Sequence, residues 1–102
     1  MPGKQVNVPY FRQALNKALK SHRMFAVEAG GQSYYPTFFA DPNLDRRKVQ
    51  RVAQALGDLG GWEKWLFFTT PKSSLGRRTP LQAMREGKYE GARLAAVGHA
   101  ER

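Results

Sequence analysis

The stretch DRRKVQRVAQALGDLGG, residues 45–61, carries the clearest helical signal in the sequence. Its apolar residues recur three and four positions apart, which places them on one face of an α-helix. They are Val49, Val52, Ala53, Leu56 and Leu59. Asp41, Asn43 and Asp45 compete for the N-cap position, and several glycines follow the stripe. The stretch therefore predicts an amphipathic helix with one buried face.

The same stretch begins with a group of cations. Arg46, Arg47, Lys48 and Arg51 occupy the first turns of the expected helix, where positive charge opposes the helix dipole. Because this placement costs some stability, it favours a functional reason for these side chains. A second basic group lies in residues 1–23, which contain no acidic residue. Its members include Arg12, Lys17, Lys20 and Arg23.

The net charge is +9, from 17 Lys and Arg against 8 Asp and Glu. Such a charge is typical of proteins that bind a polyanion or an acidic protein. Two interpretations of both basic groups stay open, a solvated helix face or contact with nucleic acid. The eight cations named above are the candidate nucleic-acid residues.

The amino-terminal residues 1–23 are expected to form one basic helix. Asn7 is a candidate N-cap, and Pro9 is tolerated in the first turn. An apolar stripe runs along this helix, which should end near residues 21–22. The stripe consists of Phe11, Leu15, Ala18 and Leu19.

Residues 24–40 change to a strand-like pattern and predict a β-hairpin. Phe25 and Val27 alternate with less apolar neighbours, and Gly30-Gly31 supplies a turn. Pro36 cannot donate a hydrogen bond to a strand ladder, so it should end the second strand or lie on an edge.

Two motifs follow the central helix. WEKWLFF, residues 62–68, places Trp62, Trp65 and Leu66 on one face of a short helix, followed by Phe67 and Phe68. We expect this cluster to belong to the core rather than to form an aromatic platform for bases. SLGRRTPLQAMREG, residues 74–87, contains a capping box. In it Thr79 is the N-cap, Pro80 the first helical residue, Gln82 the reciprocal partner and Gly87 the C-terminal stop. A last helix should start near Tyr89 and fray over residues 98–102.

These elements predict one compact domain over residues 1–102, mainly α with a small β-hairpin (α+β) and four to five helices. Its parts are a basic helix (1–23), a hairpin (24–40) and a helical region (41–102). The chain is 41% apolar, so it can bury a core. We expect a cytoplasmic protein, since the sequence has no cysteine, no leader and no membrane-spanning run.

The sequence lacks the residue patterns of common active sites. There is no GxxxxGK[ST] loop, and His22 and His99 lie in no cluster with metal-ligand spacing. The carboxylate pairs Asp41/Asp45 and Glu86/Glu90 fit capping and surface roles better than acid–base chemistry. We therefore expect no enzymatic activity, no metal and no cofactor. The two remaining classes are a protein-binding module and a nucleic-acid-binding protein.

An ordered series of short motifs resembles a known family. YYPTFF (34–39), the amphipathic helix, WEKWLFF and SLGRRTPLQAMREG occur in the order found in the carboxy-terminal toxin-binding domain of Xre/MbcA/ParS-type antitoxins. The resemblance covers about residues 24–102. The matching positions are Tyr35, Pro36, Trp65, Pro71, Leu75, Gly76, Arg78, Thr79, Pro80, Leu81, Met84 and Gly87.

The resemblance implies a function and a partner. Such antitoxins pair with RES-domain toxins that consume NAD, and they cover the entrance to the toxin active site. Full-length members carry an amino-terminal helix-turn-helix, whereas residues 1–23 have room for one helix. Many relatives dimerise, so a homodimer is expected. The partner-facing set carried over from the resemblance is Arg77, Arg78, Arg85, Lys88, Arg93, His99 and Arg102.

Overall fold

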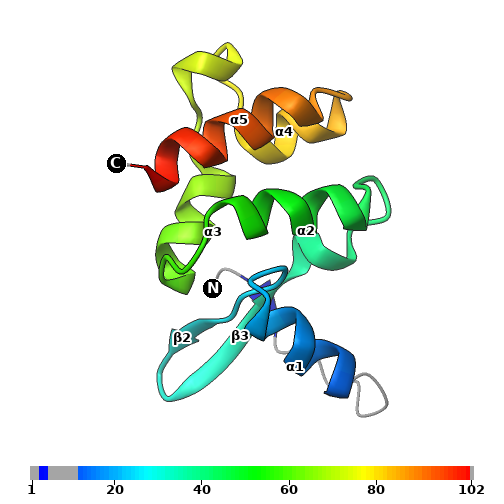
Figure 1. Ribbon diagram of the computed structural model, residues 1–102, viewed down its shortest axis with the longest axis vertical. Coiled ribbons are helices and arrows are strands. Elements are labelled where there is room, and N and C mark those ends of the chain that lie inside the picture. The colour runs from blue at the N-terminus through cyan, green and yellow to red at the C-terminus, as the bar shows by residue number, and fades with distance from the viewer. Residues whose placement is uncertain (1–2, 5–11, 102) are drawn as a thin grey trace.

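The computed structural model describes residues 3–4 and 12–101, and it confirms a mainly helical domain with a small antiparallel hairpin (Figure 1). The α-helices are α1 (Arg12–Lys20), α2 (Arg46–Ala55), α3 (Gly61–Thr69), α4 (Pro80–Arg85) and α5 (Tyr89–Ala100). The strands in the described ranges are β1 (Gly3–Lys4), β2 (Val27–Ala29) and β3 (Gln32–Pro36). The same ranges contain the 3₁₀ helices η2 (Thr37–Ala40) and η3 (Ser73–Leu75). Within the described ranges, no helix has the length and apolarity needed to cross a bilayer.

The first helix ends close to the predicted position. The last residue of α1 is Lys20, and Ala18 of the expected stripe is buried. The predicted cap at Asn7, with Pro9 and Phe11, lies outside the described residues.

The hairpin is confirmed, with two corrections. Gly30 and Gly31 have positive φ at the turn between β2 and β3, and Pro36 is the last residue of β3. An unpredicted strand, β1, pairs antiparallel with the other side of β3, giving the sheet order β1-β3-β2. Residues 37–40, assigned to the hairpin, form a 3₁₀ helix instead, because the ladder ends at the proline and Phe38 and Phe39 turn into the core.

The structure selects one cap for α2. The Asp45 Oδ1 accepts hydrogen bonds from the backbone amides of Arg47 (3.0 Å) and Lys48 (3.3 Å), so Asp45 is the N-cap. Asp41 is used in the preceding turn, where it accepts from the Asn43 amide. The predicted stripe is confirmed for Val49, Val52, Ala53 and Leu56, which are buried. It is wrong for Leu59, which lies beyond the end of α2 and is partly buried.

Phenylalanine rings form the centre of the core. They come from the hairpin, from η2 and from α3, so three separate segments are joined by one aromatic cluster. The ring centroids of Phe38 and Phe68 are 4.8 Å apart, and those of Phe25 and Phe39 are 5.3 Å apart in an edge-on arrangement. Figure 1 shows α3 between the sheet and the α4–α5 pair.

The prediction for the buried face of α3 is wrong for two residues. Trp62 and Leu66 are 47% and 51% exposed, while the helix buries Phe67, Phe68 and Lys64. These three residues lie at i, i+3 and i+4 and therefore share one face of the helix. Because one of them is a charged lysine, the sequence does not show this face as an apolar stripe. The aliphatic stem of Lys64 packs in the core like an apolar side chain.

Two contacts attach the start of α3 to the hairpin. Gly61 lies so close to β2 that an added Cβ would be 1.9 Å from the carbonyl oxygen of Ala26. The indole Nε1 of Trp62 donates a hydrogen bond of 3.1 Å to the carbonyl oxygen of Glu28. Only a glycine permits the first contact, so residue 61 decides how closely helix and hairpin pack.

Lys64 carries an unfavourable charge into this packing. Only 3% of the residue is exposed, and burial lowers the pKa of its amine, although Asp58 opposes the shift. The ammonium lies 5.9 Å from the centroid of the Phe25 ring, which partly offsets the lost hydration. Lys64 is therefore a source of instability at neutral pH.

Lys64→Met is expected to raise the free energy of unfolding by about 1 kcal/mol at pH 7. The folded-state pKa lies below the unfolded value, so the unfolded chain binds more protons between the two, and wild-type stability rises with pH through this window. The gain from Lys64→Met should therefore shrink as the pH approaches 10.5, the ordinary lysine value. Urea denaturation at pH 7 and pH 10 measures both effects. Exposed Lys20→Met is the matched control, and an equal gain there would contradict the burial argument.

Candidate partner-binding surface

The loop before α4 is held by its own backbone hydrogen bonds. The Lys72 amide donates to the carbonyl of Arg78 (3.0 Å), and the Arg77 amide donates back to Lys72 (2.9 Å). Gly76 and Arg77 both have left-handed backbone conformations, with φ of 64° and 67°. The loop therefore reverses tightly and presents Arg77 as an exposed side chain.

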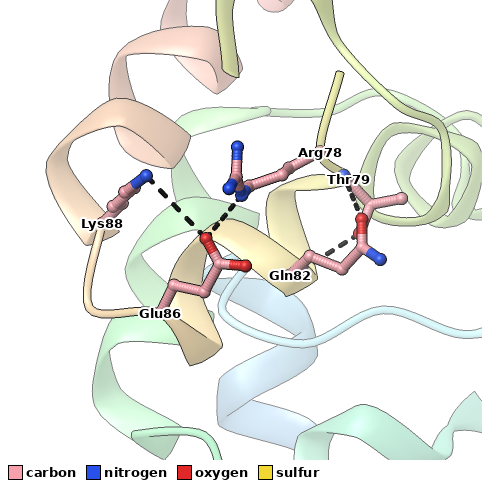
Figure 2. Close-up of polar contacts among 5 residues, drawn as sticks. All are labelled: Arg78, Thr79, Gln82, Glu86 and Lys88. Atoms are coloured by element: carbon pink, nitrogen blue, oxygen red, sulfur yellow. Dashed lines mark hydrogen bonds and ion pairs between the residues drawn. The ribbon is translucent and has the colours of Figure 1, made fainter. Parts of the chain in front are cut away.

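The capping box is confirmed in full (Figure 2). The hydroxyl of Thr79 accepts from the Gln82 amide (3.0 Å), and the Gln82 side chain accepts from the Thr79 amide (2.8 Å). Pro80 is the first residue of α4, and Gly87 adopts the predicted left-handed conformation at φ 81°. Four residues of the motif are thus accounted for by helix formation.

Arg78 belongs to the same structural unit, although it was predicted to face a partner. Its Nε lies 2.5 Å from Glu86 Oε1, and Lys88 Nζ lies 3.8 Å from the same oxygen. Figure 2 shows both cations directed at Glu86 from opposite sides. Because Arg78 precedes α4 and Glu86 is its C-cap, this ion pair joins the two ends of the helix.

Two more candidate arginines are also paired. Arg85 Nη2 lies 2.8 Å from Asp41 Oδ2, and Arg93 pairs with Glu90 one turn earlier. The hydrogen bond from Arg85, together with the Asn43 amide, lowers the pKa of Asp41. The hydrogen bond from Arg93 likewise lowers the pKa of Glu90. A partner would have to compete with these carboxylates for the arginines.

The carboxy-terminal candidates occupy different surroundings. The predicted fraying over residues 98–102 is wrong for residues 98–100, which belong to α5. The ring of His99 contacts the ring of Phe67 with 5.4 Å between centroids. Arg102 lies outside the described residues. Of the seven candidates, the structure leaves Arg77 exposed and without an ion pair among the described residues.

Exposed apolar side chains are the feature that the sequence did not reveal. Trp62, Leu66 and Leu94 are 47%, 51% and 58% exposed, and we call them the exposed apolar residues. Trp62 is packed edge-on against Trp65 at 5.9 Å. One signal in the sequence could have predicted them: α3 contains more large apolar residues than one helix face can bury. Which of them stay outside depends on how the helix docks.

A shallow hollow is lined by one of these residues, Leu94. Its volume is about 480 Å³, and it lies between the end of α3, η3 and α5. Phe67, Leu94 and Ala95 form its apolar wall, Gly91 and Gly98 open space beside them, and Lys72 lies at the rim. The hollow thus lies where the end of α3 meets α5, and Leu94 is the exposed apolar residue that lines it.

The candidate nucleic-acid residues lie on α1, on α2 and, in the case of Arg23, in the turn after α1. Arg46, Arg47, Lys48 and Arg51 are exposed on α2, and Lys17 and Lys20 are exposed on α1. The Arg23 side chain donates to the Ser21 hydroxyl (2.7 Å), and Arg12 lies at the start of α1. In the described part of the chain, no three His, Cys, Asp or Glu side chains are grouped to hold a metal ion.

Comparison of the chain with protein-family models, with curated proteins and with solved structures finds no match.

Proposed function

We propose that this chain is an antitoxin-like protein-binding module that neutralises a RES-type, NAD-consuming toxin in the cytoplasm by steric occlusion. The observation that carries the proposal is the set of exposed apolar residues on α3 and α5. Large side chains such as tryptophan and leucine cost free energy when left in water, and a partner that covers them recovers it. The resemblance of the ordered motifs over residues 24–102 to Xre/MbcA/ParS-type antitoxins supports a RES-type toxin as the partner.

The surroundings of these residues fit a protein interface. Leu94 lines a shallow hollow whose wall is apolar and whose lining includes Lys72, and an apolar centre with a charged rim is the usual composition of such a surface. Arg77 supplies an exposed cation that no carboxylate in the described residues holds by an ion pair. Its guanidinium suits a carboxylate on the rim of the toxin. Occlusion requires no reacting group from this chain.

The proposal predicts that the neighbouring gene encodes a RES-type protein, that the two proteins copurify and that the complex no longer consumes NAD. Leu66→Arg and Leu94→Arg are expected to weaken the complex by about 30-fold each, since each places an uncompensated charge in an apolar contact. Titration calorimetry measures the affinity, and an NAD assay measures the return of toxin activity.

Asn43→Arg is the matched control, because it adds the same charge at an exposed position away from α3 and α5. It should leave the affinity unchanged, and thermal melts should show that all three variants fold. If the neighbouring protein does not copurify, or if both leucine variants bind it as tightly as wild type, the proposal is wrong.

A further inference from the structure

The ion pairs divide the positive charge of the molecule unequally. Among the described residues, they engage Arg78, Arg85, Lys88 and Arg93, all in the carboxy-terminal quarter of the chain. Among the described side chains, Lys17 and Lys20 of α1 and the cations of α2 take part in none. The surface formed by these two helices therefore keeps its charge uncompensated.

The start of α2 illustrates this imbalance. Its nearest carboxylate, Asp45, accepts hydrogen bonds from backbone amides, and the exposed side chains of Arg46 and Arg47 follow it. Lys48 is directed elsewhere, with its ammonium 5.5 Å from the centroid of the Tyr89 ring. Neither packing nor capping accounts for the arginines, whose charge opposes the helix dipole.

A contact between α2 and the end of α1 brings the two basic groups together. Arg47, Arg51 and Gln54 follow at i, i+4 and i+7, so they share one face of α2. The Gln54 side chain donates to the carbonyl of Ser21 (3.1 Å), just beyond α1. The face with Arg47 and Arg51 thus contacts Ser21, whose hydroxyl accepts a hydrogen bond from Arg23. Lys17 and Lys20 lie in the last turns of α1, just before this contact.

The geometry points to a binding surface for double-stranded DNA along this face, with Arg47 and Arg51 at its centre. Arg47 and Arg51 stand about 6 Å apart along the helix axis, and their guanidinium forks suit successive backbone phosphates. No aromatic residue occurs between 12 and 20 or between 46 and 55, so the surface lacks the stacking platforms of single-strand binders. Among its described side chains, none is an exposed large apolar residue of the kind expected at a protein interface.

Fluorescence anisotropy with a labelled duplex of about 20 bp tests this inference on the full chain. With about four phosphate contacts, we expect the affinity to fall on the order of 100-fold between 50 and 200 mM salt. Arg47→Gln/Arg51→Gln should reduce the slope of log K against log salt by about 1.8. Arg77→Gln/Lys88→Gln removes the same charge elsewhere and should leave the slope unchanged.

Three results would overturn the inference. They are the absence of duplex binding at 50 mM salt, equal or tighter binding of a single strand or of poly-glutamate, and equal slope changes in the two double variants. The surface is independent of the proposed toxin contact. Leu66→Arg should keep duplex binding, and Arg47→Gln/Arg51→Gln should keep the affinity for a toxin.

Discussion

Gly61→Ala is expected to lower the free energy of unfolding by about 3 kcal/mol. The added methyl group would lie 1.9 Å from the Ala26 carbonyl oxygen, a backbone atom that cannot rotate away. Relief requires α3 to move away from the hairpin, which would weaken the Trp62–Glu28 hydrogen bond and the Phe25–Phe68 contact. Urea denaturation followed by tryptophan fluorescence and by circular dichroism measures the loss.

Gly98→Ala is the matched control. Gly98 lies within α5, and nothing approaches within 4 Å of its added Cβ, so alanine should only reduce the freedom of the unfolded chain. We expect a gain of about 0.5–1 kcal/mol. If Gly61→Ala stabilises the protein to the same extent, α3 does not approach the hairpin as closely as described.

Phe68→Ala is expected to cost about 3–5 kcal/mol, which for a domain of this size is a large part of the total stability. Phe68 is fully buried and contacts the rings of Phe25, Phe38 and Phe67. The cavity left by alanine would separate the hairpin, η2 and α3 at their common contact. A thermal melt and a urea titration should both show early unfolding.

Leu66→Ala tests the orientation of the same helix. Leu66 is half exposed, and its replacement should change stability by no more than about 0.5 kcal/mol. The sequence favoured an orientation in which Leu66 faces the core, and in that orientation Leu66→Ala would be strongly destabilising. A larger loss from Leu66→Ala than from Phe68→Ala would support that orientation and contradict the structure.

Local signals in the sequence predicted much of the fold. The capping box of α4, the glycine turn of the hairpin and the stripe of α2 each depend on residues a few positions apart, whose preferences act before any tertiary contact forms. The cap of α2 could not be predicted from local signals alone. Asp41, Asn43 and Asp45 all have side chains that can cap a helix, and only the path of the folded chain determines that Asp45 is the cap.

Long-range packing determined the remainder. The exposed side of α3 depends on where Gly61 meets the hairpin, and Arg85 pairs with an aspartate 44 positions away. The division of the cations into paired and unpaired groups arises from such contacts. The spacing of residues along the sequence contains no information about these long-range contacts. Arg78 was therefore predicted to face a partner, and Leu66 was predicted to lie in the core.

The hydrogen bond from Trp62 to Glu28 has a consequence for self-association. β2 is an outer strand of the sheet, and an outer strand offers unpaired backbone groups on which another chain can add a strand. The indole occupies the middle carbonyl of this three-residue strand, and the start of α3 lies against Ala26 just before it. The tryptophan therefore blocks sheet extension on this side, which protects a small, highly charged protein from aggregation through its hairpin.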